Sequence, residues 1–157
     1  MGIISFQGAR AKVKKLDTTP IKVSDYMTKD LITFSPKQSV MEVMETLVKC
    51  KISGGPVINE RNELLGIISE GDCIKQLNES RYYNMPIDDA NVERFMARDV
   101  ETIDGNISIF DAANKFLETK RRRFPILEDG KLVGQISQKD IMKAALKMNS
   151  QNWRDKC

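Results

Sequence analysis

The apolar positions of this chain follow the same order in two consecutive segments. In each segment, residues spaced i, i+3, i+4, i+7 and i+8 predict one face of an amphipathic helix. These positions are Val40, Val43, Met44, Leu47 and Val48 in the first segment, and Ile109, Ala112, Ala113, Phe116 and Leu117 in the second. Ser39 and Ser108 stand where the N-caps of these two helices are expected.

Short apolar runs before and after each helix predict strands. We expect them at 31–34, 55–58 and 64–68 in the first segment, and at 100–103, 124–127 and 132–136 in the second. Turns at Arg61-Asn62 and Asp129-Gly130 separate the last two strands of each segment. A helical turn opens each unit, at 23–27 and 92–96, and a helix beginning near Glu70 or Gln138 closes it. The predicted order is helix, strand, helix, strand, strand, helix.

The two units are an internal repeat. Tyr26-Met27 recurs as Phe95-Met96 and Pro56 as Pro125, at a common offset of 69 residues. A unit of about 60 residues is marginal as an independent domain, so we expect the two to pack face to face about a pseudo-twofold axis. The predicted fold class is α/β (α+β). We divide the chain into an arm (1–22), a first repeat (23–80), a linker (81–91), a second repeat (92–147) and a tail (148–157).

Composition narrows the possible functions. Of the 157 residues, 41% are hydrophobic and 30% charged, as in a soluble globular protein. The sequence has no histidine, which excludes His-activated nucleophiles and His-containing zinc sites. Its three cysteines form no Cys-x-x-Cys pair, so no metal site is visible. We therefore expect a protein that is not an enzyme, with no catalytic residues and no metal ligands.

The chain carries no segment that resembles a signal peptide or a membrane span. The apolar run at the N-terminus is too short for a signal peptide, and no other run is long enough to cross a bilayer. We expect a cytoplasmic protein without membrane contact. The net charge of +3 does not by itself indicate nucleic-acid binding.

One motif occurs once in each repeat. Its form is Gly-x-Ile-Ser-x-x-Asp, at 66–72 and at 134–140, where a strand runs into a helix. A capping box has the same Ser-x-x-Asp spacing and needs no ligand. Alternatively, the hydroxyl, the carboxylate and the free N–H groups of the helix end suit a ligand with hydroxyl groups and an anion, such as a nucleotide.

Together these features resemble those of a known family. Met27-Thr28-Lys29-Asp30 precedes the first strand, Gly55-Pro56-Val57 opens the second, and the repeated motif follows the third. In order, spacing and duplication they are similar to a pair of cystathionine-beta-synthase (CBS) domains, also called a Bateman module. The resemblance implies a pseudo-symmetric regulatory module with two clefts between its halves. Such modules bind AMP, ADP, ATP or S-adenosylmethionine as regulatory ligands, often for energy sensing, and need no other cofactor.

The resemblance also implies roles for particular residues. Asp72 and Asp140 would accept hydrogen bonds from ribose hydroxyls, assisted by Ser69 and Ser137. The adenine and phosphate region would be lined by Ile52, Ser53 and Gly54 and by Arg121, Arg122 and Arg123. Thr28 would lie at a cleft mouth, where Ala97 stands in the second repeat. Thr102 completes the predicted ligand-binding set. We further expect a homodimer and an unidentified effector protein as partner.

The basic run at 120–123 leaves alternatives open. Cations at the end of a helix complement its dipole without any ligand, whereas Arg side chains also clamp phosphate oxygens. Because the first repeat has only Lys51 at this place, we expect the two clefts to differ in basic charge and affinity. A nucleic-acid-binding protein that uses the basic arm and Arg121–Arg123 is a less favoured alternative, as is a ligand-free dimerisation adaptor.

Overall fold

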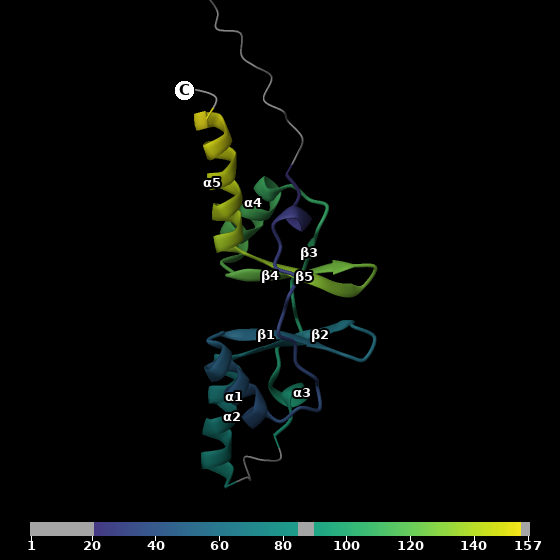
Figure 1. Cartoon of the computed structure of the whole chain (residues 1–157). Coiled ribbons are helices and arrows are strands. Elements are labelled where there is room, and N and C mark those ends of the chain that lie inside the picture. Colours follow the sequence, from purple (N-terminus) through teal and green to yellow (C-terminus); the bar gives the residue numbers. More distant parts are fainter. Residues whose placement is uncertain (1–20, 85–89, 155–157) are drawn as a thin grey trace, which may run out of the picture.

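The computed structural model describes residues 21–84 and 90–154, which form two lobes stacked end to end (Figure 1). In the first lobe, β1 (Gly54–Ile58) and β2 (Leu64–Ser69) form an antiparallel hairpin. In the second, β4 (Arg123–Glu128) is antiparallel to β5 (Lys131–Ser137), and β3 (Ile103–Asp104) runs parallel to β4. The sheets face each other at the centre of the molecule, and the long helices lie on one side of it. The predicted α/β fold of two repeats is confirmed.

The helices follow the predicted order. They are the 3-10 turn η1 (Val23–Asp25), α1 (Val40–Cys50), α2 (Glu70–Tyr83), α3 (Val92–Phe95), α4 (Ile109–Thr119) and α5 (Gln138–Arg154). The predicted N-caps are confirmed, because the hydroxyls of Ser39 and Ser108 accept hydrogen bonds from the N–H groups of Glu42 and Asp111, at 3.2 and 3.1 Å. Within the described residues, no helix is both long and apolar enough to cross a bilayer.

The lobes do not coincide with the sequence repeats, because each repeat gives its opening segment to the other lobe. Val23, from the first repeat, is fully buried among Ile103, Phe116 and other core residues of the second lobe. Val92, from the second repeat, is fully buried in the core of the first lobe. Figure 1 shows η1 beside β3 to β5 and α3 beside α1 and α2. Neither repeat alone contains a complete core.

Backbone pairing across the lobes repeats with the same pseudo-symmetry. Thr28 exchanges two hydrogen bonds with Gln135 of β5, at 2.8 and 3.0 Å, and Ala97 exchanges two with Ile67 of β2, at 2.8 and 2.9 Å. The hairpin tips also meet, since the side-chain amide of Asn62 donates to the carbonyl of Leu132 at 2.8 Å. The crossing segments therefore pair with the inner edges of both sheets.

The predicted strands at 31–34 and 100–103 are largely wrong. In the first lobe only Phe34 pairs with β1, through a single parallel bridge to Val57, and in the second the strand is Ile103–Asp104. Proline explains where the pairing stops. The next hydrogen bond toward residue 31 would need an N–H at Pro56, and the equivalent bond in the second lobe would need one at Pro125.

Two apolar positions of the predicted helix faces are not in the core. Val40, Val43 and Leu47 are buried, as expected, but Val48 is 79% exposed and its counterpart Leu117 is 80% exposed. The periodicity marks both residues as part of an apolar face without showing what covers them. They lie on the side of the molecule that carries all four long helices.

The structure describes only part of the predicted linker and of the two predicted terminal segments. Helix α2 enters the predicted linker 81–91 and ends at Tyr83, and Ala90 at the other end is 8% exposed. Helix α5 likewise enters the predicted tail 148–157 and ends at Arg154. Residues 1–20, 85–89 and 155–157 lie outside the described residues, so most of the predicted arm does as well.

We predict that Gly66→Ala destabilises both lobes together. A Cβ at Gly66 would lie 2.6 Å from the carbonyl oxygen of Ala97 and 2.9 Å from Sδ of Met96, both in the crossing segment. Such overpacking costs about 1–3 kcal/mol. In urea denaturation followed by circular dichroism, the free energy of unfolding should fall by this amount in one transition.

Gly71→Ala is the matched control, because its Cβ would meet only Oγ of Ser69, at 3.7 Å. Alanine in a helix is favoured over glycine by about 0.5–1 kcal/mol, so this variant should be as stable as the wild type or more so. Equal stability of the two variants would contradict the close approach at Gly66.

Candidate functional site

Both copies of the Ser-x-x-Asp motif form the same hydrogen-bonded turn. In the first, the backbone N–H and the hydroxyl of Ser69 donate to Oδ2 of Asp72, each at 2.9 Å. In the second, the same two groups of Ser137 donate to Oδ2 of Asp140, also at 2.9 Å. The capping-box interpretation is therefore correct for both copies, and it occupies one carboxylate oxygen in each.

The second oxygen of each carboxylate remains for another donor. Within the described residues, no hydrogen bond reaches Oδ1 of Asp72 or Oδ1 of Asp140. Asp140 is only 9% exposed, whereas Asp72 is half-buried. A carboxylate with one oxygen fixed and one open can orient a ligand hydroxyl without reorganising the helix end.

The segment after α1 lies directly beside the first turn. Helix α1 ends at Cys50, and the left-handed conformation of its C-cap residue Lys51 (φ 54°) turns the chain. The carbonyl of Ser53 then accepts a hydrogen bond from the N–H of Glu70 at 2.9 Å, and Gly54 pairs with Ser69. A Cβ at Gly54 would lie 2.7 Å from the carbonyl oxygen of Ile68, so only glycine permits this approach. The structure thus brings Ser53 and Gly54 together with Ser69.

The arginine run has the equivalent place in the second lobe. The carbonyls of Arg121 and Arg122 accept hydrogen bonds from the side chain and the backbone of Gln138, both at 3.3 Å, and Arg123 pairs with Ser137. The side chain of Arg121 forms an ion pair with Glu101, at 3.6 Å. In the described part of the chain, the guanidinium groups of Arg122 and Arg123 have no acidic partner.

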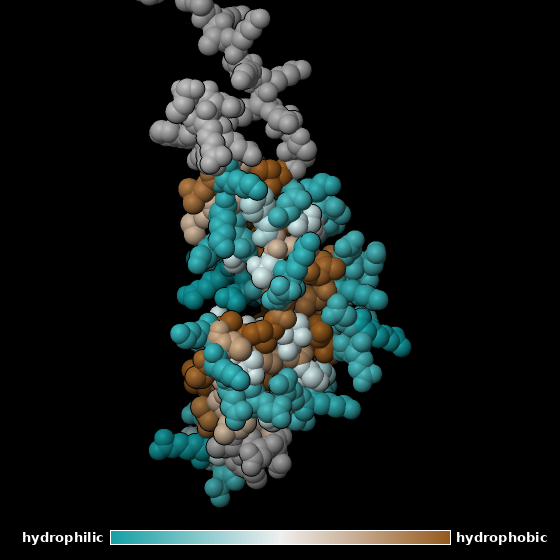
Figure 2. Space-filling view, in the orientation of Figure 1, coloured by the Kyte–Doolittle hydropathy of each residue, from teal (hydrophilic) through white to brown (hydrophobic). Residues whose placement is uncertain are grey.

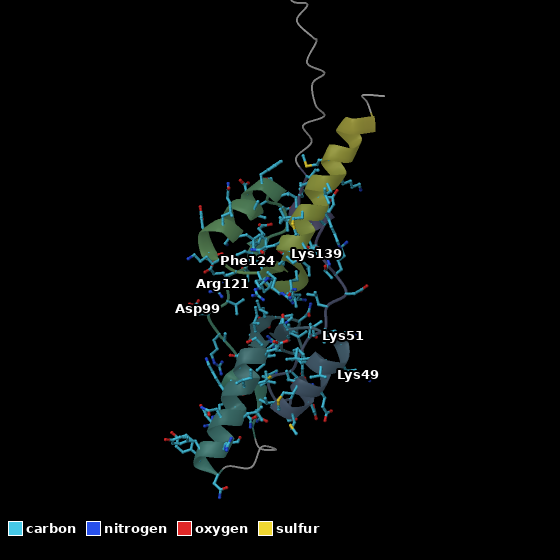
Figure 3. All side chains as sticks on the ribbon, turned by 90° about the vertical axis from the view of Figure 1, so that its left-hand side faces the viewer. Lys49, Lys51, Asp99, Arg121, Phe124 and Lys139 are labelled. Carbon is cyan, nitrogen blue, oxygen red and sulfur yellow. The ribbon has the colours of Figure 1, made fainter. Side chains whose placement is uncertain are left out.

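The turn at 69–72 and the turn at 137–140 each face the end of a helix in the other lobe. Figure 3 shows α4 above α2 on one side of the junction, with Arg121 and Asp99 there, and α5 above α1 on the other, with Lys51 and Lys139 there. The beginning of α2 therefore faces the end of α4, and the beginning of α5 faces the end of α1. In Figure 2 the surface is hollowed at this junction. Each half of the candidate site combines residues of both lobes.

The two predicted threonines lie on the second lobe. Thr28 pairs with Gln135, two residues before Ser137, so it lies near the second turn. The carbonyl of Thr102 accepts a hydrogen bond from Nζ of Lys115 at 2.9 Å, which places Thr102 beside α4 and next to Glu101. Ile52 precedes Ser53 and packs against the core of the first lobe, so its side chain contributes to the wall rather than to polar contacts.

The sequence analysis did not identify three charged residues that lie near the two turns. Glu101 and Asp99 lie near Arg121, whereas Lys139 comes from a variable position of the motif and shares its side of the junction with Lys51. The half of the site next to α4 therefore exceeds the half next to α1 in positive charge by less than the arginine run suggests. In the sequence, the only sign of Lys139 at the site was that the variable positions of the motif are Glu70-Gly71 in the first repeat and Gln138-Lys139 in the second.

The cysteine next to the first turn does not add reactive chemistry to the site. Cys73 follows Asp72 and is 3% exposed; its burial, and to a lesser degree the negative charge of Asp72, raise the pKa of its thiol. A protonated, buried thiol is a poor nucleophile. No group of three or more His, Cys, Asp or Glu side chains in the described ranges could hold a metal ion.

Three cavities in the described residues lie away from the two turns or touch only their edge. A polar cavity of about 540 Å³ lies between the loops at 33–38 and 58–60, and another of about 370 Å³ lies at 104–106 and 126–129. A mainly apolar cavity of about 290 Å³ opens between α1 and α2. None of the three is lined by a predicted ligand-binding residue.

Comparison with known proteins identifies the repeats. The model of the CBS domain family matches this chain twice, at residues 23–79 and 92–147. The crystal structure of CBSX2 of Arabidopsis thaliana in complex with AMP superposes with a TM-score of 0.72, at 32% identity over 82% of this chain and 98% of that one.

Two further matches have the same architecture. The CBS domain pair of protein MJ0100, crystallised with 5-methylthioadenosine and S-adenosyl-L-methionine, has a TM-score of 0.65 and 26% identity, over 80% of this chain and 95% of that one. Uncharacterized protein MJ1225 of Methanocaldococcus jannaschii is 30% identical over 77% of this chain, which spans 41% of the length of that relative.

We predict that Asp140→Ala lowers the free energy of unfolding by about 1 kcal/mol without any ligand, since the N–H and hydroxyl of Ser137 lose their acceptor. Asp140→Asn keeps an oxygen at this place and should lose less. Urea denaturation of both variants measures the difference. If the free energy of unfolding falls by the same amount in both variants, the capping interaction does not contribute as described. If it falls less in Asp140→Asn, that variant is the better one for testing ligand binding, because its fold is less disturbed.

Proposed function

This chain belongs to the CBS domain family, and we propose that its two repeats form a regulatory module that binds an adenosyl ligand at the junction of the lobes. The observation that carries the proposal is the duplicated turn, in which Asp72 and Asp140 each leave one carboxylate oxygen open beside a helix N-terminus. Adjacent ribose hydroxyls are the donors that suit such an oxygen, because they can reach it without disturbing the cap.

The remaining predicted residues would each contact a different part of the ligand. Ser69 and Ser137 orient the carboxylates, and the wall at Ile52, Ser53 and Gly54 gives a flat base access to the backbone. Arg122 and Arg123 are available for phosphate oxygens, which planar guanidinium groups bind in pairs. Thr28 lies beside Gln135, near the second turn, and Thr102 lies beside α4. Arg121 would bind phosphate only after leaving Glu101.

We infer the class of ligand from its chemistry and from the relatives. AMP, ADP and ATP combine a ribose with phosphates, and S-adenosylmethionine shares the ribose and adenine. The AMP bound to CBSX2 and the S-adenosyl-L-methionine bound to the MJ0100 pair support the common adenosyl part. Adenine nucleotides are favoured because Arg121 lies at one half of the site, and Lys51 and Lys139 lie at the other (Figure 3).

Regulation requires a recipient of the signal. A ligand shifts a conformational equilibrium only when it binds one arrangement better than another. We propose that the module acts as a cytoplasmic homodimer on an effector protein and has no catalytic role of its own. Binding to nucleic acid is less favoured, since Glu101 and Asp99 lie beside the arginine run.

We predict that one adenosyl ligand raises the melting temperature. A panel of AMP, ADP, ATP, S-adenosylmethionine and cyclic di-AMP should contain a ligand that, at about 100 times its dissociation constant, adds about 2.7 kcal/mol of stability, or roughly 2–8 °C. Asp72→Asn or Asp140→Asn should abolish the shift and so identify the working half of the site. A flat panel with a folded protein would overturn the proposal and favour the adaptor or nucleic-acid alternatives.

We predict that Arg122→Gln combined with Arg123→Gln weakens binding of phosphorylated ligands if they use the half of the site next to α4. Hydrogen bonds to charged groups contribute about 1.5–3 kcal/mol, so calorimetry should show at least about tenfold weaker binding of AMP or ATP. Binding of S-adenosylmethionine should change little. Lys37→Gln removes a cation that lines the separate cavity at 33–38 and 58–60 and serves as the control; an equal loss there would indicate a general effect of charge.

A further inference from the structure

Hydrogen bonds join the two lobes at the tips of their hairpins as well as at the crossing segments. At the tips, the side-chain amide of Asn62 donates to the carbonyl of Leu132 at 2.8 Å, and the N–H of Leu132 donates to the carbonyl of Asn62 at 3.0 Å. Glu63 and Lys131 form an antiparallel bridge beside them. Asn62 therefore contacts the other lobe with both its main chain and its side chain.

The turn that carries Asn62 is braced from within. The side-chain oxygen of Asn59 accepts hydrogen bonds from the N–H groups of Arg61 and Glu63, at 2.9 and 3.0 Å. The N–H of Asn62 donates to the carbonyl of Asn59 at 3.0 Å. Asn62 itself has a left-handed conformation (φ 62°), which asparagine adopts more readily than most residues. The turn therefore presents the amide in a fixed direction.

The second hairpin has no equivalent of this side chain. Glu63 and Lys131 each stand three residues before the glycine that opens the repeated motif, so they are equivalent positions and their bridge lies on the pseudo-twofold axis. By the same count, Gly130 is the counterpart of Asn62, and it is left-handed as well (φ 76°). The pseudo-symmetry of the fold accounts for the meeting of the tips but not for the amide, which only the first repeat supplies.

The opposite edge of the junction lacks such a connection. In Figure 1 both hairpins point away from the long helices, whereas α2 and α5 begin at the other edge, where the candidate site lies. Within residues 21–84 and 90–154, no hydrogen bond or ion pair joins α1 or α2 to α4 or α5. Hydrogen bonds thus fix the lobes at the centre and at the hairpin edge, and the edge at the site is the one that can open.

We propose that Asn62 is a positioning residue for the candidate site. Its contact with Leu132 is a latch that holds the hairpin edge closed, so that the lobes open and close at the opposite edge, where a ligand would bridge them. A ligand that contacts both lobes binds more tightly when their spacing is already correct, because less conformational freedom is lost on binding. This effect on affinity rests on the proposed function, whereas the latch itself exists without any ligand.

Asn62→Gly tests the latch, because glycine keeps the left-handed turn and removes only the amide. Amide hydrogen exchange is followed by NMR without ligand. The N–H groups of Leu132, Gln135 and Ile67, which donate to Asn62 and to the crossing segments, should exchange about two- to tenfold faster, the factor that one net hydrogen bond corresponds to. The N–H of Ile58, which donates to Phe34 within the first lobe, should exchange at the wild-type rate.

Two further variants separate the latch from other effects of the substitution. Asp129→Gly places a glycine at a left-handed position of the other hairpin and should leave all these rates unchanged. Asn62→Asp turns an acceptor toward the carbonyl of Leu132 and should accelerate exchange at least as much as Asn62→Gly. Wild-type rates in Asn62→Gly, an equal acceleration at Ile58, or the same acceleration in Asp129→Gly would each overturn the latch.

Calorimetry with AMP and with S-adenosylmethionine tests the effect on the site. The ligand that binds the wild type should bind Asn62→Gly about two- to tenfold more weakly and Asp129→Gly equally well. Wild-type affinity in Asn62→Gly would overturn the positioning role. If the exchange rates change as expected but no member of the nucleotide panel binds the wild type, the proposed function fails and the latch stands.

Discussion

The exchange of opening segments between the lobes is the constraint on which the rest of this structure depends. Val23 and Val92 leave their own repeats and become completely buried in the opposite lobes, where full burial of such a side chain contributes about 1.5–3 kcal/mol. The segments that carry them must cross the junction. Thr28 and Ala97 therefore pair with β5 and β2 and draw the two sheets together. Removing either repeat would leave the other without part of its core.

The same constraint positions the candidate site. Because the crossing segments hold the sheets face to face, each helix that begins at the junction faces the end of a helix from the other lobe. The beginning of a helix presents N–H groups and a partial positive charge, and its Asp is fixed there by the cap. A site of this kind needs no motion of the cap to receive a ligand. Its selectivity then depends on the residues that the opposite lobe supplies, such as Lys51 or Arg123.

Local patterns were sufficient to predict the elements of the fold. Helices α1 and α4, their serine caps and both hairpins depend on spacing and turn residues that are close in sequence. The exchange of segments could not be predicted, because Val23 has the same local pattern whichever lobe it enters. The strand at 31–34 failed because its partner strand contains Pro56, a property of the pairing rather than of the segment. For the site, the resemblance to CBS domains implied that Ser53 and Ser69 belong together, whereas the proximity of Glu101 to Arg121 exists only in three dimensions.

The site and the exposed helix faces share their structural elements, and this relation indicates how a ligand could produce a signal. Helices α2 and α5 begin at the candidate site and carry the exposed apolar side chains of Ile74 and Met142. A ligand that bridges the lobes contacts the first turn of one helix and the last turn of another. Any change in the angle between the lobes must therefore move the exposed side chains of Ile74 and Met142 relative to each other. Linkage then requires that the ligand and any partner bound to these side chains change each other's affinity by the same factor.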